Sequence, residues 1–178
     1  MKPIDAVREF HEKFDQPVRV TPCVDDEGTN QLRLNLLLEE LRELGEALGY
    51  KLVHDAHEDR IFFASTGRLD MMRGLDLDKA VATLDALTDL QYVLDGSYVS
   101  LGLAAWKDAA FEEVHRSNMS KVWADGSVRK HPDGKVMKPD TYSSADLRGV
   151  LLRPDPKRCS CGCAIIDCEY CASECATF

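Results

Sequence analysis

Two groups of acidic residues have a spacing that places carboxylates together on helix faces. Glu39, Glu40 and Glu43 fall within residues 36–45, where leucines recur as on a helix with one buried face. Glu40 and Glu43 are three residues apart, so their carboxylates lie on one side of that helix, one turn apart. Like charges at this spacing repel, and hard divalent cations choose oxygen ligands of this kind. The turn is therefore either a solvated acidic face or part of a metal site.

The second group is Asp85 and Asp89, in a predicted helix that starts after Asp76 as its N-cap. Aspartate has a low helix propensity, so two of them in the middle of a helix need an explanation. Helices that carry paired carboxylates can pack with the pairs facing each other and form an oxygen-rich metal site. We favour this over a partly exposed polar stripe. The expected ligands of two or more Mg²⁺ or Mn²⁺ ions are Glu39, Glu40, Glu43, Asp85 and Asp89.

The pattern Glu39-Glu40-x-x-Glu43 followed by an Asp-rich turn resembles the all-α nucleoside triphosphate pyrophosphohydrolases, MazG-like and phosphoribosyl-ATP-pyrophosphohydrolase-like. That family continues with Glu-x-x-Asp, whereas Ala86 stands three residues before Asp89 here, and Asp85 is the nearest acid that could replace the missing ligand. Three more segments look like the phosphoribosyl-ATP-pyrophosphohydrolase-like branch: Phe10-His11-x-x-Phe14-Asp15-Gln16-Pro17, Glu113-Val114-His115-Arg116-Ser117-Asn118-Met119-Ser120-Lys121, and Asp133-Gly134-Lys135-Val136 followed by Lys138-Pro139.

The resemblance implies a MazG-like helical bundle built on four core helices, and a homodimer or homotetramer. It implies hydrolysis of a (d)NTP to a (d)NMP and diphosphate, with Glu39 or Glu40 as general base and Lys121 beside the leaving diphosphate. The substrate contacts would be Phe14, Asn35, Asn118 and Lys121. For Phe14 a plain core role is an equal alternative. For Asn118 and Lys121 the alternative is an ordinary helix end, where lysine is favourable anyway.

The base of the nucleotide is harder to infer. Family members act on deoxyuridine, deoxycytidine, purine or damaged nucleotides, and some phage members of similar size act on purine deoxynucleotides. The resemblance therefore makes dGTP or dATP the expected substrate, with a role in controlling the dNTP pool. The alternatives are a pyrimidine (dUTP or dCTP) or damaged-nucleotide pyrophosphohydrolase, or a non-enzymatic zinc-binding adaptor with a helical body.

The elements that must position these residues are mainly helices. Apolar periodicity predicts them over residues 4–14, 30–48, 76–102, 104–121 and 143–152. Residues 50–66 have strand-like composition at both ends and could form a small hairpin or a helical excursion. Residues 128–137, which contain Pro132-Asp133-Gly134, predict a small β-hairpin.

Composition is consistent with a globular enzyme. The chain has 178 residues and a net charge of −9, which argues against binding a nucleic-acid polymer. No apolar run is long enough to cross a membrane, and acids interrupt the N-terminus where a signal peptide would be apolar. We therefore expect a cytoplasmic protein, in the host cytoplasm if it is phage-encoded.

Residues 1–153 are predicted to form the all-α domain, and 154–178 a cysteine-rich tail. Six of the seven cysteines lie in this tail, and Cys168-x-x-Cys171 has the spacing of a zinc site. Bound Zn²⁺ is one interpretation, and a disordered or oxidised tail is the other.

Overall fold

The computed structural model describes residues 1–67 and 76–153, and the chain divides into two compact units, Met1–Ala104 and Ala105–Phe178. The first unit holds three helices and a hairpin: α1 (Pro3–Lys13), α2 (Glu27–Ala47), β1 (Tyr50–Asp55), β2 (Arg60–Ser65) and α3 (Leu77–Ser100). The second holds α4 (Lys107–Met119) and α5 (Leu147–Leu151), and a 3₁₀ turn, η1 (Ala104–Trp106), precedes α4 in the sequence. The predicted all-α class is confirmed.

The two long helices are capped by aspartates. The Asp76 carboxylate accepts a hydrogen bond from the Lys79 amide, as predicted. Asp26 does the same for the Thr29 amide, which is why α2 begins three residues earlier than residue 30. Gly49, at φ +87°, ends α2 in the left-handed conformation that glycine adopts most easily.

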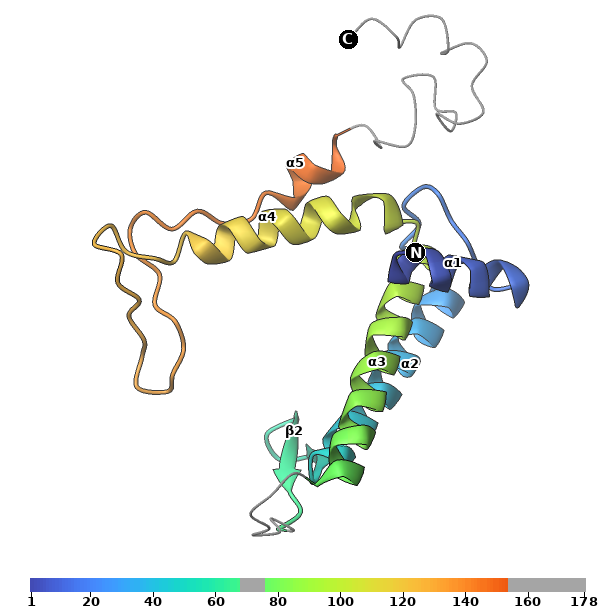
Figure 1. Cartoon of the computed structure of the whole chain (residues 1–178), viewed down its shortest axis with the longest axis horizontal. Coiled ribbons are helices and arrows are strands. Elements are labelled where there is room, and N and C mark those ends of the chain that lie inside the picture. The colour runs from blue at the N-terminus through green and yellow to red at the C-terminus, as the bar shows by residue number, and fades with distance from the viewer. Residues whose placement is uncertain (68–75, 154–178) are drawn as a thin grey trace, which may run out of the picture. The chain divides into compact units, whose positions relative to one another are not determined.

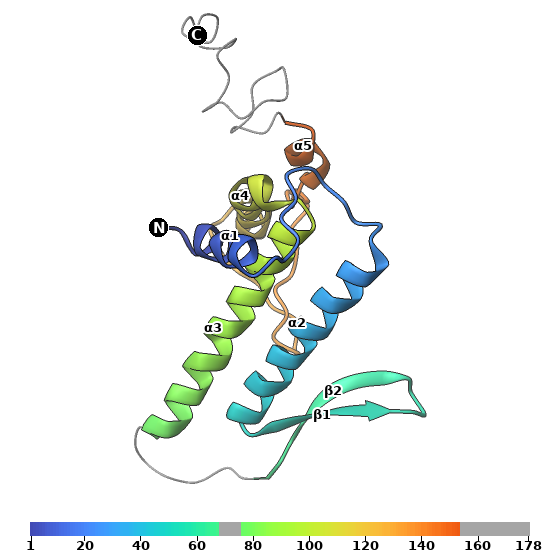
Figure 2. The same ribbon diagram turned by 90° about the vertical axis from the view of Figure 1, so that its right-hand side faces the viewer.

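α2 and α3 lie side by side along their length, and α1 packs against α3 (Figures 1 and 2). Small residues allow this approach. A β-carbon at Gly96 would lie 3.0 Å from His11 Nε2 and 3.1 Å from an Arg33 Nη atom, so α1, α2 and α3 meet closely at this glycine. His11 and Arg33 are both buried, and His11 Nδ1 is hydrogen-bonded to the Pro17 carbonyl at 3.0 Å.

The segment after α2 is a hairpin, which decides between the two alternatives for residues 50–66. β1 and β2 pair antiparallel, from Tyr50 opposite Ser65 to Asp55 opposite Arg60. The Phe63 ring lies directly over Gly45 of α2, where a methyl group would collide with it.

The predicted hairpin at residues 128–137 is reduced to an isolated bridge between Lys130 and Val136. The chain does turn back, because the His131 amide donates to the Lys135 carbonyl at 2.8 Å. Pro132 has no N–H to donate, and the residues beside the bridge do not continue as strands.

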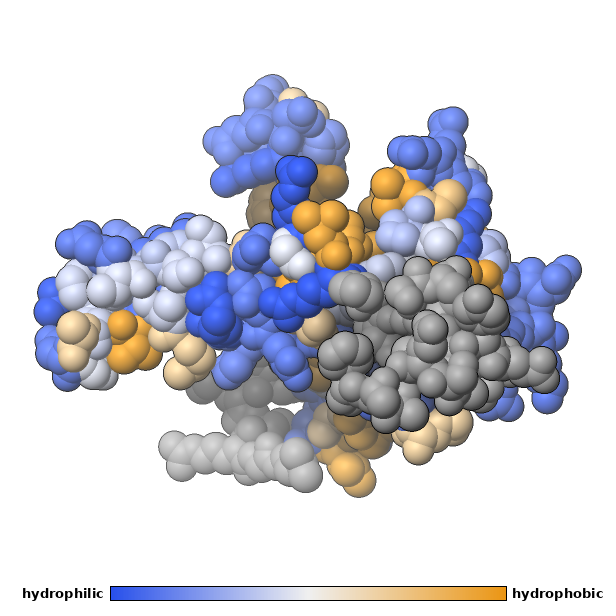
Figure 3. Space-filling model, turned by 90° about the horizontal axis from the view of Figure 1, so that it is seen from above, coloured by the Kyte–Doolittle hydropathy of each residue, from blue (hydrophilic) through white to orange (hydrophobic). Residues whose placement is uncertain are grey.

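Most large apolar side chains in the described residues stay partly exposed. The buried apolar residues there are Val7, Ala86, Val99 and Val150. Figure 3 shows exposed apolar side chains, in orange, among hydrophilic ones on one face of the molecule. On α2 and α3 they recur at helical spacing: Leu34, Leu38, Leu41 and Leu48, and Leu77, Val81, Leu84 and Leu87. Within the described residues of the first unit, these apolar stripes therefore lack a covering layer.

Among the helices of the described residues, none combines the length and apolar character needed to cross a bilayer.

The C-terminal end of α3 gives a stability prediction. Gly102, at φ +71°, lies against the Thr21 carbonyl, and the Cys23 amide donates to the Leu101 carbonyl at 3.0 Å. Gly102→Ala would put an alanine in the left-handed backbone conformation and would also bring its β-carbon into collision with the backbone of Thr21. At Gly49, by contrast, the nearest atom to a new β-carbon is 4.0 Å away. We expect Gly49→Ala to lower the free energy of unfolding by about 1 kcal/mol, and Gly102→Ala by roughly 2 kcal/mol more. Urea denaturation measures both, and equal losses would contradict this contact.

Candidate functional site

The five predicted metal ligands come from the two helices that pack together. α2 carries Glu39, Glu40 and Glu43, and α3 carries Asp85 and Asp89. Glu40 is half-buried, whereas the other four carboxylates are exposed. Because α2 and α3 lie side by side, their acidic turns can face a common space.

The charges that act on Glu40 are consistent with this arrangement. Burial is the largest cause that raises the pKa of Glu40 above its ordinary value of 4.5. The negative charges of Asp89, Glu43, Glu39 and Asp85 raise it further, in that order. Two of these charges come from α3 across the helix pair, so the structure brings all five residues into one electrostatic field centred on Glu40.

The donor set suits Mg²⁺ or Mn²⁺. Every group in the field is a carboxylate, the ligand that hard divalent cations prefer. A cation held by these oxygens would relieve the repulsion that Glu40 experiences. Within the described residues, no three His, Cys, Asp or Glu side chains form a ready-made metal cage. The carboxylates thus share a field, and the exposed ones have room to turn toward a cation.

Asn35, a predicted substrate contact, lies one turn before Glu39 on α2. Its side chain lines an open hollow of ≈ 470 Å³, together with Asp25, Glu27, Asn30, Gln31 and Leu34. Three amide side chains in one hollow can both donate and accept hydrogen bonds, as the edge of a base or a sugar requires.

Phe14, the other predicted contact in the first unit, is 58% exposed. Its ring stacks on Phe10, with centroids 4.4 Å apart, and Phe10 meets Tyr92 of α3 edge-on at 5.7 Å. Phe14 is therefore not buried within the described residues, and its role toward a substrate stays a prediction.

Asn118 and Lys121 belong to the second unit. Lys121 Nζ donates to Asn118 Oδ1 at 2.7 Å, which confirms that the two side chains share one face at the end of α4. The structure brings these two together, and their role toward a substrate stays a prediction.

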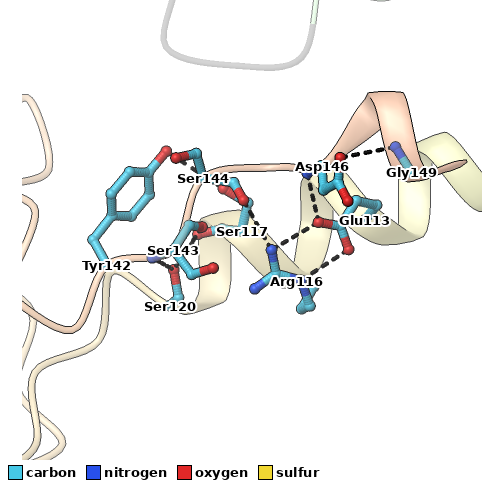
Figure 4. A network of polar contacts seen from close by, with 9 residues as sticks. All are labelled: Glu113, Arg116, Ser117, Ser120, Tyr142, Ser143, Ser144, Asp146 and Gly149. Carbon is cyan, nitrogen blue, oxygen red and sulfur yellow. Dashed lines mark hydrogen bonds and ion pairs between the residues drawn. The ribbon is translucent and has the colours of Figure 1, made fainter.

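A polar network between α4 and the segment that follows Tyr142 was not predicted (Figure 4). The Glu113 carboxylate accepts from Arg116 at 2.8 and 2.7 Å and from the Asp146 amide at 2.8 Å. Arg116 first and this amide second lower the pKa of Glu113 to about 2. Further along the helix, Ser120 Oγ accepts from the Ser143 amide at 3.0 Å.

This network changes the interpretation of the segment Glu113–Lys121. Glu113, Arg116, Ser117 and Ser120 recur at helical spacing and fasten the following segment to α4. Part of this segment is therefore structural. The sequence signal for this network was the set of polar residues at i, i+3, i+4 and i+7. That spacing does not indicate which segment of the chain these residues bind.

The cysteine-rich tail, and with it the predicted zinc site, lies outside the described residues.

Comparison with known proteins supports the resemblance. The family model of phosphoribosyl-ATP pyrophosphohydrolase (PRA-PH) matches residues 7–118, more than half of the chain. The match includes α2, α3 and all five carboxylates, and it stops before Lys121. Comparison with individual curated proteins finds no match.

The field around Glu40 can be tested by removing single charges. Asp89 is the charge that raises the pKa of Glu40 most, and Asp85 the one that raises it least. We expect Asp89→Asn to lower the Glu40 pKa more than Asp85→Asn does, although burial keeps it above its ordinary value in both. A pH titration of the Glu40 side-chain carboxyl ¹³C signal, without metal, measures this. The reverse order would contradict the arrangement of α2 and α3.

Proposed function

The chain belongs to the phosphoribosyl-ATP pyrophosphohydrolase family, whose members are nucleotide pyrophosphohydrolases, and we therefore propose that it hydrolyses a deoxynucleoside triphosphate to the monophosphate and diphosphate. The observation that carries this proposal is the field of four carboxylates around Glu40, within the region that the family model matches. A triphosphate is handled at such a site only with divalent cations, and these are the cations the donor set fits.

Glu39, Glu40, Glu43, Asp85 and Asp89 would hold Mg²⁺ or Mn²⁺. When bound, such ions neutralise charge on the triphosphate and lower the pKa of a water. Glu40, one of the two residues expected as general base, is proposed to take the proton with an oxygen that is not committed to a cation.

The proposed step balances as a hydrolysis. The oxygen of a water forms a bond to the α-phosphorus, and the bond from that phosphorus to the bridging oxygen of the β-phosphate breaks. The proton of the water goes to Glu40, and diphosphate leaves. Lys121 is proposed as a cation for the phosphate oxygens.

For the nucleoside we propose a purine deoxynucleotide, dGTP or dATP. The exposed Phe14 ring can stack on a base, and a purine offers the larger face. The amides of Asn30, Gln31 and Asn35 line the hollow on α2 and can read a base edge. A cytoplasmic location, where dNTPs are made and used, fits this reaction.

The apolar stripes on α2 and α3 support a homo-oligomer. Exposed fractions of 66% for Leu34 and for Leu84 are unusual for residues that recur at the spacing of a buried helix face. A dimer or tetramer in which these faces pack would bury them.

The reaction is tested by measuring diphosphate release from a panel of dNTPs and NTPs with Mg²⁺ or Mn²⁺. We expect release from dGTP or dATP, none after metal removal, and a loss of at least about 100-fold in kcat for Glu43→Gln and Asp89→Asn. Loss of like-charge repulsion should leave Tm without metal unchanged or slightly higher.

Glu46→Gln is the matched control, because Glu46 is exposed on α2 beside the cluster and pairs with Arg42 instead of acting on Glu40. It should keep near-wild-type turnover. Near-wild-type turnover by Asp89→Asn would contradict the site, preference for dUTP or dCTP would contradict the choice of base, and no release from any nucleotide would favour the zinc-binding adaptor.

The assembly is tested by light scattering at micromolar concentration. We expect at least a dimer, because the exposed leucines of α2 and α3 need a covering layer. Replacing Leu34 and Leu84 by Ser should shift the protein toward monomer, whereas Leu152→Ser, at an exposed leucine on neither helix, should not. A fully active wild-type monomer would refute the proposal.

A further inference from the structure

We propose that Lys121, Lys138 and the hydroxyl of Tyr142 form a binding site for the oxygens of a polyphosphate on the second unit. Lys138 and Tyr142 follow the end of the family match, so this segment would add phosphate contacts that the match does not include. The choice of ligand rests on the proposed function, whereas the site itself is argued from the contacts below.

A tight turn brings Lys138 onto Tyr142. The Tyr142 amide donates to the carbonyl of Pro139 at 2.9 Å, and Pro139 is buried. This turn places Lys138 Nζ 4.4 Å from the centroid of the Tyr142 ring, a cation–π contact that fixes both groups. The ammonium group therefore lies at the tyrosine while the Lys138 side chain remains exposed.

The end of α4 also contacts this tyrosine. Ser117, which is buried, donates from Oγ to Tyr142 Oη at 3.4 Å, and Lys121 follows four residues later, just after α4 ends at Met119. The hydrogen bond from Ser117 first, and then the charges of Lys138 and Lys121, lower the pKa of Tyr142. Both lysines thus act on one hydroxyl, although they are far apart in the sequence.

The charges at this place are not balanced by acids. Across residues 1–67 and 76–153, neither Lys121 nor Lys138 forms an ion pair with a carboxylate. On α4, Glu113 is already paired with Arg116 at 2.7 Å. Two ammonium groups and a hydroxyl that can donate suit a multiply charged anion better than a single carboxylate.

The site is held in place before any ligand arrives. Ser120 and Arg116 bind the backbone of Ser143 and Ser144, and Glu113 binds the amide of Asp146 (Figure 4). These bonds fix the chain just after Tyr142 along α4. A fixed set of donors loses less conformational entropy on binding, which favours affinity.

The probe is inorganic tripolyphosphate, bound to the full-length chain without divalent metal and followed by calorimetry. Without metal the carboxylates of α2 and α3 repel the anion, so binding reports the lysine site. Lys138→Gln and Tyr142→Phe should each weaken binding by about tenfold, the loss expected for a charge-assisted hydrogen bond.

Lys135→Gln is the matched control. It removes the same charge from an exposed lysine of the same segment, and the contacts of Lys135 are made by its backbone within the turn at Asp133. It should bind tripolyphosphate as the wild type does. A far-ultraviolet circular dichroism spectrum and Tm establish that each variant is folded. If Lys138→Gln does not fold, the tripolyphosphate affinity of Tyr142→Phe, which removes only a hydroxyl, tests the site.

The outcomes separate this inference from the proposed function. Tripolyphosphate binding that weakens in Lys138→Gln and Tyr142→Phe, in a protein that hydrolyses no nucleotide, would support the anion site and reject the enzyme. Nucleotide hydrolysis together with unchanged tripolyphosphate binding in both variants would overturn the anion site and keep the enzyme. No binding by the wild type, or equal weakening in Lys135→Gln, would also overturn it.

Discussion

The repulsion among carboxylates between α2 and α3 is the interaction on which this account depends. Glu40 is partly withdrawn from water, and four negative charges act on it from two helices. A divalent cation would offset this concentration of like charge. The same repulsion that destabilises the metal-free helix pair would make the pair a binding site for cations and, through them, for a triphosphate.

Packing fixes where those charges meet. Gly96 admits His11 and Arg33 between the helices, and Phe63 of the hairpin closes over Gly45 one turn after Leu41. The first contact holds α2 and α3 together at one end, and the second holds the hairpin against α2 at the other. Neither contact covers the leucines of α2 and α3, which is why we propose a second copy of the chain as their covering layer.

Local signals in the sequence predicted where the helices lie and some of their ends, but they missed the Asp26 cap of α2 and placed the start of α5 four residues too early. Asp76 caps α3 and Gly49 ends α2 because these features depend on residues only a few positions apart. The facing of the carboxylates was predicted from spacing and is consistent with the field on Glu40, whereas the metal itself stays a prediction. The pairing of Glu113 with the Asp146 amide was missed, because a side chain that binds a distant backbone leaves no periodic pattern. A hairpin was predicted over residues 128–137, where the structure has only the bridge between Lys130 and Val136. Turn residues predict a reversal of the chain but not the length of the strands beside it.

We propose that the protein binds a divalent cation at the carboxylates around Glu40. Mn²⁺ is paramagnetic and broadens the signals of nearby nuclei, so a titration with substoichiometric Mn²⁺, followed by site-assigned side-chain carboxyl ¹³C signals, locates the ion directly. The account predicts that the signals of Glu39, Glu40, Glu43, Asp85 and Asp89 broaden first. Earlier or equal broadening at Asp25 and Glu27, the acids beside the start of α2, would contradict it.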